Sequence, residues 1–293
     1  MLTSPSRFAA ASLCVAIAGG CAQGEDGATR PSFAEPDASA PAPSGPGGAF
    51  GDSGTAPPDA NIECAEETKQ VYVLATDKAL YRFDPQPLKF TRVGTLNCPA
   101  TAGTFSMAVD RRGTAWVEYT DGNLFEVDTR TAKCKPTAFK AGQTGFETFG
   151  MGFASDAEGS SAETLFMAGA GLASLDTKTF AVTYRGSLAL GRTELTGRGA
   201  ELFAFSVSSG TVANLDKATA ATIKSYRTTA IDPASAFAFA HWGGDFWIFT
   251  GTDNSIVTQY SPATDTSKVV VQNAGILIVG AGSSTCAPTT PPR

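Results

Sequence analysis

A fivefold internal repeat constrains the fold of this chain more than any other feature. Each copy has two apolar residues three positions apart, followed in four copies by Asp: ALYRFDP (79–85), NLFEVDT (123–129), GLASLDT (171–177), TVANLDK (211–217) and IVTQYSP (256–262). Successive copies begin 44, 48, 40 and 45 residues apart. This spacing is typical of one four-stranded propeller blade, whereas a helical tetratricopeptide repeat has about 34 residues.

Further β-rich runs flank each copy. One precedes it, as in VYVLATD (71–77) and AWVEYTD (115–121), and a thinner one follows, as in KFTRVGTL (89–96) and AVTYRGSL (181–188). The dipeptides Asp121-Gly122 and Ser209-Gly210 suit tight hairpins. No segment has a 3.6-residue apolar period, so we expect an all-β fold with little helix.

A fourth strand precedes copies two to five. These runs are FSMAVD (105–110), FGMGFASD (149–156), ELTGRG (194–199) and SAFAFAHW (235–242), and their small residues suit innermost strands around a narrow channel. Copy one has no such run, but the C-terminal ILIVGAG (276–282) can supply it. The sequence therefore predicts a five-bladed β-propeller over residues 63–288, closed by the C-terminal strand. Because ELTGRG is a weak strand, a six-bladed or irregular ring is the alternative.

Ring closure also predicts a disulfide. The end of ILIVGAG would lie beside the start of VYVLATD, so Cys64 and Cys286 flank the same seam. Cys98 and Cys134 then pair by elimination, although simple strand directions place them near opposite faces. Four cysteines allow three connectivities, so the second bridge stays open.

The N-terminus has the features of an export signal. Residues 1–7 carry one Arg, and FAAASLCVAIA (8–18) is an uncharged apolar run too short to span a bilayer. Ala18-Gly19-Gly20-Cys21 resembles the bacterial lipobox, which implies a signal peptide over residues 1–20 and a lipidated Cys21 that anchors the protein in a membrane. The family usually has Leu where Ala18 stands. Cleavage after Ala18 is the alternative, and it would give a secreted protein.

Residues 21–62 predict a disordered tether. Residues 22–60 contain seven Pro and seven Gly, and only Phe33 and Phe50 are aromatic. Such a segment buries too little apolar surface to offset the entropy lost on ordering. Residues 289–293 are expected to be a disordered tail.

Charge and composition exclude some partners. The formal net charge of −6 argues against nucleic acid, which requires clustered Lys and Arg. No CxxC, HExxH or paired-carboxylate motif is present, so no cofactor or metal is expected. The repeated Asp84, Asp128, Asp176 and Asp216 are best explained by Asx turns that end the third strand of each blade.

The strongest candidate for a ligand site surrounds the only histidine. His241 lies in AHWGGDFW with Trp242, Asp245 and Trp247, at the hairpin between the first two strands of the fifth blade. An imidazole beside aromatic rings and a carboxylate can act as a general base or a stacking corner. We favour the structural interpretation, in which His241 bonds to hairpin backbone and the tryptophans pack between blades. Glu147, Glu194 and Asp232 lie on connections into the inner strands, but they are scattered.

MAVDRRGTAWVEYTDGNLFEVDT (107–129) resembles the blades of sensor-like propellers in bacterial secreted proteins, and the whole chain resembles predicted propeller lipoproteins of that kind. The resemblance implies a fold but no activity. We expect a lipid-anchored protein of the cell envelope, at the outer membrane or surface, that serves as a binding or scaffolding module for a protein or glycan. An envelope lyase or hydrolase and a structural envelope component are the alternatives.

Overall fold

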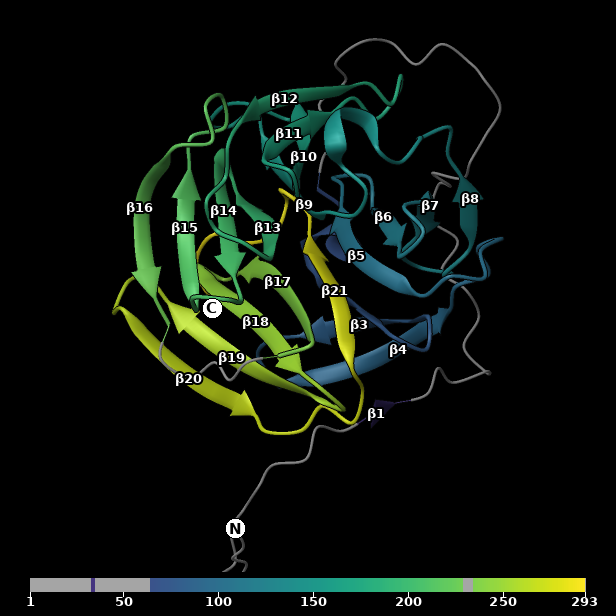
Figure 1. The fold of residues 1–293 in the computed structure, drawn as a ribbon. Helices are drawn as coiled ribbons and strands as arrows, with labels where there is room; N and C mark the ends of the chain where they lie inside the picture. The colour runs from purple at the N-terminus through teal and green to yellow at the C-terminus, as the bar shows by residue number, and fades with distance from the viewer. Residues whose placement is uncertain (1–32, 35–63, 229–233, 293) are drawn as a thin grey trace, which may run out of the picture.

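The structure, a computed structural model, describes residues 33–34, 64–228 and 234–292. Five antiparallel blades of four strands each surround a common axis, as Figure 1 shows, and the sheet of blade 1 has a short fifth strand at its outer edge. The chain is therefore a five-bladed β-propeller, as its repeat predicts. Helical structure in the described part is limited to the 3-10 turns η1 (Glu66–Lys69) and η2 (Gln143–Gly145).

Each blade has four strands, named in order from the innermost outward. Blade 1 contains β21 (Ile278–Ser283), β2 (Val71–Ala75), β3 (Ala79–Asp84) and β4 (Lys89–Thr95). Blade 2 contains β5 (Thr104–Val109), β6 (Thr114–Tyr119), β7 (Leu124–Asp128) and β8 (Cys134–Pro136). Blade 3 contains β9 (Gly150–Ser155), β10 (Glu163–Ala168), β11 (Leu172–Leu175) and β12 (Val182–Gly186). Blade 4 contains β13 (Thr193–Arg198), β14 (Glu201–Ser206), β15 (Thr211–Leu215) and β16 (Thr222–Arg227). Blade 5 contains β17 (Ala236–Trp242), β18 (Asp245–Gly251), β19 (Ser255–Ser261) and β20 (Thr266–Val271).

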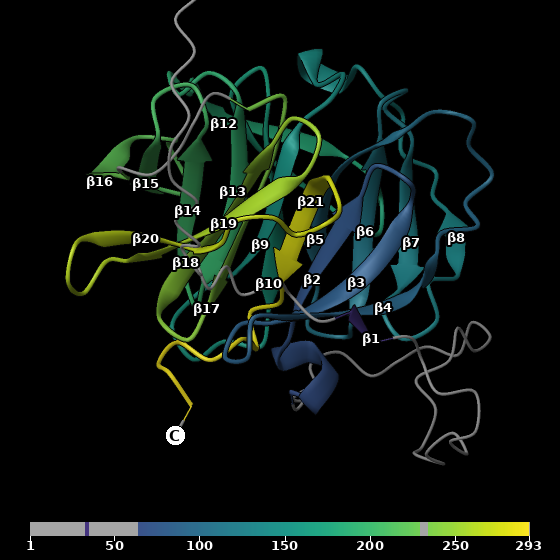
Figure 2. The same ribbon diagram turned by 90° about the horizontal axis from the view of Figure 1, so that it is seen from below.

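The C-terminal strand closes the ring in the predicted way. β21 pairs antiparallel with β2, so that Ser283 lies opposite Val71 and Ala281 opposite Val73. Just beyond this seam Cys64 and Cys286 form the predicted disulfide. Figure 2 shows η1 and the C-terminus on the same side of the ring, which we call the C-terminal face.

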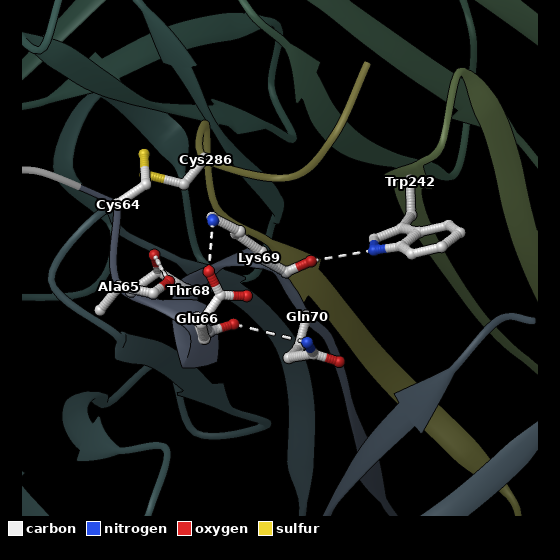
Figure 3. A network of polar contacts seen from close by, with 8 residues as sticks. All are labelled: Cys64, Ala65, Glu66, Thr68, Lys69, Gln70, Trp242 and Cys286. Atoms are coloured by element: carbon white, nitrogen blue, oxygen red, sulfur yellow. Dashed lines mark hydrogen bonds and ion pairs between the residues drawn. A yellow bond between two sulfur atoms is a disulfide. The ribbon is translucent and has the colours of Figure 1, made fainter. Parts of the chain in front are cut away.

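A network of polar contacts fastens this seam to blade 5 (Figure 3). The Trp242 indole donates to the carbonyl of Lys69 at 2.9 Å, and the hydroxyl of Ser284 donates to the carbonyl of Thr68 at 2.6 Å. Both carbonyls belong to η1, which directly precedes β2. The two ends of the propeller and the neighbouring blade are therefore held at one point.

The second disulfide joins Cys98 to Cys134, so the expectation that these residues lie near opposite faces is wrong. The outer strand of blade 1 reaches the outer hairpin of blade 2: a Cβ on Gly94 would lie 3.1 Å from the Cβ of Ala132. Blade strands twist, so the outer edge of one blade leans toward the next. Strand direction alone does not include that lean.

The small residues of the inner strands are required by their close approach to one another. A Cβ added at Gly150 of β9 would lie 2.1 Å from the Thr193 carbonyl oxygen on β13, and one at Gly197 would lie 2.1 Å from the Phe153 carbonyl oxygen. No side chain can occupy such positions. Large buried side chains such as Phe83, Phe203 and Phe249 instead fill the spaces between blades.

The repeated aspartates form the expected turns. The Oδ1 atom of Asp176 accepts the backbone N–H groups of Lys178 and Thr179. The Oδ1 atom of Asp216 likewise accepts those of Ala218 and Thr219. Asp84 and Asp128 each accept the N–H of the residue two positions later. Their role is to end the third strand of a blade.

Two segments outside the predicted propeller also contact it. Phe33–Ala34 forms β1, a parallel addition to β4 within the expected tether. In the expected disordered tail, the Pro292 carbonyl accepts a hydrogen bond from Gln86 at 3.4 Å. The carbonyl of Pro288, just before that tail, accepts the Gly243 N–H at 2.7 Å and directs the chain across the C-terminal face. Within the described residues, no helix is long and apolar enough to cross a membrane.

Candidate functional site

A polar pocket of about 380 Å³ lies on blade 3. It forms where β10 begins, β11 ends and β12 runs along the outer edge of the blade. Its lining contributes four charged side chains, several hydroxyls and two leucines: Glu163, Thr164, Leu165, Ser174, Leu175, Asp176, Thr177, Lys178, Thr183 and Arg185. Hydrogen-bond donors and acceptors therefore dominate the pocket.

The position of Arg185 is fixed by the neighbouring strand. Its Nε and Nη2 atoms donate to the Oγ of Ser174 at 3.1 and 2.9 Å, and Ser174 is only 6% exposed. Arg185 itself is the extra residue of a β-bulge, because Gly186 pairs with Leu172 while Tyr184 pairs with the next residue, Ala173. A bulge changes the direction of a side chain, and here it brings the guanidinium over β11.

Glu163 joins the pocket to the closing seam. Its Oε1 atom accepts the Arg111 backbone N–H at 2.7 Å, and its Oε2 atom accepts the Thr285 hydroxyl at 2.8 Å. Burial raises the pKa of Glu163 to about 7, against the effect of these two hydrogen bonds. The Arg111 guanidinium also donates to Thr285 and to the sulfur of Cys64. One wall of the pocket is thus held by blade 2 and by the segment after β21.

Two buried carboxyl groups lie near the axis of the ring. Glu118 of β6 accepts the Phe149 N–H at 3.0 Å, and Glu194 of β13 accepts the Met151 N–H at 3.4 Å and the Ser106 hydroxyl at 2.9 Å. Burial raises the pKa of Glu118 to about 9, with the nearby Glu194 as a smaller cause, and burial also raises the pKa of Glu194 well above its usual range. Burial thus favours the protonated form of both groups, and their hydrogen bonds connect blades 2, 3 and 4.

His241 is buried between blades 4 and 5, with 1% of its surface exposed. Its ring meets the edge of Phe246, with centroids 5.7 Å apart, and its Nε2 atom has no hydrogen-bond partner among the described residues. Burial, with the charge of Arg198 as a smaller cause, lowers the pKa of His241 to about 3. A neutral imidazole enclosed in this way cannot reach a substrate in this conformation.

The other three residues of that candidate cluster separate into different contacts. Trp242 bonds to η1 as described, and the Trp247 indole donates to the Trp242 carbonyl at 3.1 Å and packs in the core between blades 5 and 1. Asp245 accepts a hydrogen bond from Gln259 at 2.6 Å. None of these contacts joins His241 to Asp245, so the structure does not assemble them into a site.

The remaining sequence candidates lie apart from one another. Glu147 is exposed on the connection before β9, whereas Glu194 is buried on the axis. Asp232 and Cys21 fall outside the described residues. Across the described ranges, no group of three or more His, Cys, Asp or Glu side chains is placed to hold a metal ion.

Sequence reasoning missed the pocket and half of the buried carboxyl pair. Glu118 gave a signal. It lies on the same face of its strand as Trp116, and a charged residue inside a strand that neighbouring blades cover on both faces must be buried. Arg185 gave a weaker one: AVTYRGSL has Arg where the corresponding KFTRVGTL has Val93. Its contact with Ser174 depends on the bulge register, which the sequence alone does not show.

No protein-family model and no curated protein matches this chain. Solved structures align at low similarity. The extracellular domain of BT4673 from B. thetaiotaomicron aligns with a TM-score of 0.37 and 12% identity, over 68% of this chain and 26% of that one. Myxococcus xanthus glutaminyl cyclase aligns with a TM-score of 0.39 and 14% identity, over 73% of this chain and 75% of that one. A Bacteroides thetaiotaomicron protein of unknown function aligns with a TM-score of 0.44 and 13% identity, over 70% of this chain and 56% of that one.

The chain thus spans about a quarter of the first of these proteins and about half of the third. Scores this low carry no argument about function, and the propeller assignment depends on the strand order of this chain itself. The two disulfides are typical of proteins that fold in an oxidising compartment outside the cytoplasm.

Proposed function

We propose that this chain is an exported, lipid-anchored envelope protein whose propeller is a binding module for a glycan or protein, with the blade 3 pocket as its ligand site. The observation that carries the proposal is the pocket itself: about 380 Å³, polar, and built on three strands of blade 3 and the turn that joins two of them. A site held by a rigid scaffold loses little entropy when it binds a ligand.

The lining favours a glycan over an apolar protein segment. Protein interfaces usually depend on buried aromatic and aliphatic anchors. In this pocket the only apolar side chains are Leu165 and Leu175, while hydroxyls and charged groups supply most of the lining that the structure describes. Sugar hydroxyls, which donate and accept hydrogen bonds, match such a surface.

Catalysis is the less supported role for this propeller. The one histidine of the chain is buried and neutral, and the carboxyl pair on the axis is enclosed by the inner strands. A structural role without a ligand would leave the polarity of the pocket unexplained.

Binding is tested by immobilising the full-length protein with its disulfides oxidised and passing over it glycans and proteins from the envelope of the producing organism. Retention of a glycan by the wild type, reduced in a Ser174→Leu, Thr183→Leu variant of the pocket, supports the proposal. Equal retention by both proteins, or retention of nothing, overturns it.

Anchoring is tested separately with Cys21→Ser. We expect the wild type to incorporate a fatty-acid label and to sediment with membranes, and the variant to do neither. An unlabelled wild type in the soluble fraction would refute lipidation.

A further inference from the structure

Blade 3 departs from the repeat of its own ring at one position. The outer strands of blades 1, 3 and 5 share a β-bulge opposite the start of the third strand, and the bulged residues are Val93, Arg185 and Val270. Val93 and Val270 pack against the core clusters of their blades. Blade 3 places a guanidinium where the other two blades have a small apolar side chain.

This guanidinium has no carboxylate partner among the described residues. The ion pairs among the described residues involve Lys69, Arg130, Lys135 and Arg198. The hydrogen bonds of Arg185 go to the neutral hydroxyl of Ser174. These bonds use Nε and one proton of Nη2. Nη1 and the second Nη2 proton therefore remain as donors on a cation that is already oriented.

The two carboxylates of the pocket are directed to other partners. Both oxygens of Glu163 accept hydrogen bonds from Arg111 and Thr285, behind the wall of the pocket. Asp176 accepts turn N–H groups and lies close enough to Lys178 for the lysine charge to help lower the pKa of the carboxyl group. Neither carboxylate of the pocket therefore bonds to Arg185.

The chain becomes basic after Asp176. Residues 178–227 contain seven Lys and Arg against three Asp and Glu, although the whole chain has a formal net charge of −6. One of the three acids is Glu194, which is buried on the axis with a raised pKa. The chain from Lys178 to the end of blade 4 is therefore basic, whereas blade 3 itself has four acids, Asp156, Glu158, Glu163 and Asp176, against the two bases Lys178 and Arg185.

We propose that the blade 3 pocket binds an acidic glycan, with the carboxylate of a uronic acid residue held by the guanidinium of Arg185. This inference rests on the proposed function and narrows its ligand class. A guanidinium presents parallel N–H groups that match a carboxylate in a two-point contact. The hydroxyl of Thr183 and the second carboxylate oxygen of Asp176 line the same pocket and can bind sugar hydroxyls. Thr164, whose hydroxyl donates to Asp156 at 2.7 Å, can still accept one.

Binding is measured by calorimetry on the full-length protein with an oligogalacturonate and with its fully methyl-esterified form, which is neutral but otherwise matched. We expect the acidic form to bind at least tenfold more tightly. Arg185→Gln should lose about tenfold to a hundredfold in affinity for it, the range of a charged hydrogen bond. Arg185→Lys keeps the charge without the planar guanidinium, and its affinity should lie between those of the wild type and Arg185→Gln. Arg227→Gln removes the same charge from exposed β16 outside the pocket and should change affinity less than about twofold.

Each contrary result has a distinct meaning. Equal binding of both glycans, unchanged in Arg185→Gln, overturns the acidic ligand but keeps a glycan site and the proposed function. Binding of polyglutamate as tight as that of oligogalacturonate replaces the glycan with an acidic protein segment. Failure of all three probes overturns this inference, while retention from the envelope still decides the proposed function. Thermal melting of each variant shows that lost binding is not lost folding.

Discussion

The disulfide at the closing seam should contribute more to stability than any other covalent feature of the chain. Cys64 and Cys286 are 222 residues apart, whereas Cys98 and Cys134 are 36 apart. In the chain-entropy relation, a cross-link restricts the unfolded chain more as the closed loop lengthens. The two loops correspond to about 5 and about 4 kcal/mol at 25 °C, both as upper values because strain in the folded state reduces them.

The perturbation is the double variant Cys64→Ser, Cys286→Ser, with Cys98→Ser, Cys134→Ser as the matched control. Urea unfolding of each oxidised protein, followed by tryptophan fluorescence, gives the free energy of unfolding. We expect the seam variant to lose more free energy than the control, by about 1 to 2 kcal/mol. It should also exchange the amide protons of β21 faster, because β21 and β2 would then be joined only by their hydrogen bonds.

A seam variant as stable as the wild type, or more stable than the control variant, would refute this reasoning. It would mean that strand pairing and the contacts of η1 close the ring without help from the covalent link.

Three further predictions concern the interior. Gly150→Ala should cost more than about 2 kcal/mol in calorimetric stability because its Cβ would overlap the Thr193 carbonyl, whereas Gly103→Ala, with its nearest neighbour 3.9 Å away, should be nearly neutral. The raised pKa of Glu118 means that only the unfolded chain releases this proton between about pH 4.5 and 9. The group therefore lowers stability as pH rises, by up to about 1.4 kcal/mol per pH unit, and Glu118→Gln should flatten that fall in urea titrations. The lowered pKa of His241 has the opposite consequence: between pH 6.5 and about 3 only the unfolded chain binds the proton, so stability falls as pH falls. His241→Phe should weaken this loss of stability at low pH and leave ligand binding unchanged. If the variant no longer bound the ligand, His241 would belong to the ligand site after all.

The fold could be predicted because its determinants are periodic. Repeated apolar pairs and small inner-strand residues occur once per blade, and a turn aspartate occurs in four of the five blades. The absent first inner strand identified the C-terminal strand as its replacement. The same reasoning placed Cys64 beside Cys286. Cys98 and Cys134 required the twist of the outer strands, which brings Gly94 to Ala132 and has no counterpart in a sequence pattern.

The candidate site was harder because it departs from the period. His241 attracted attention as the only histidine, but strand alternation alone could not show that its ring faces the core between blades 4 and 5. Arg185 stood in a run that resembles its counterparts, and its meaning depends on a bulge that shifts the pairing by one residue. Glu118 and Glu194 come from different blades, and only the closed ring brings their carboxyl groups together.

The most direct test of a ligand site on blade 3 is hydrogen–deuterium exchange of the full-length protein, with and without the envelope glycan fraction that it retains. We expect slower exchange in peptides from residues 163–185, and unchanged exchange around His241. Protection confined to other blades, or none anywhere, would contradict it.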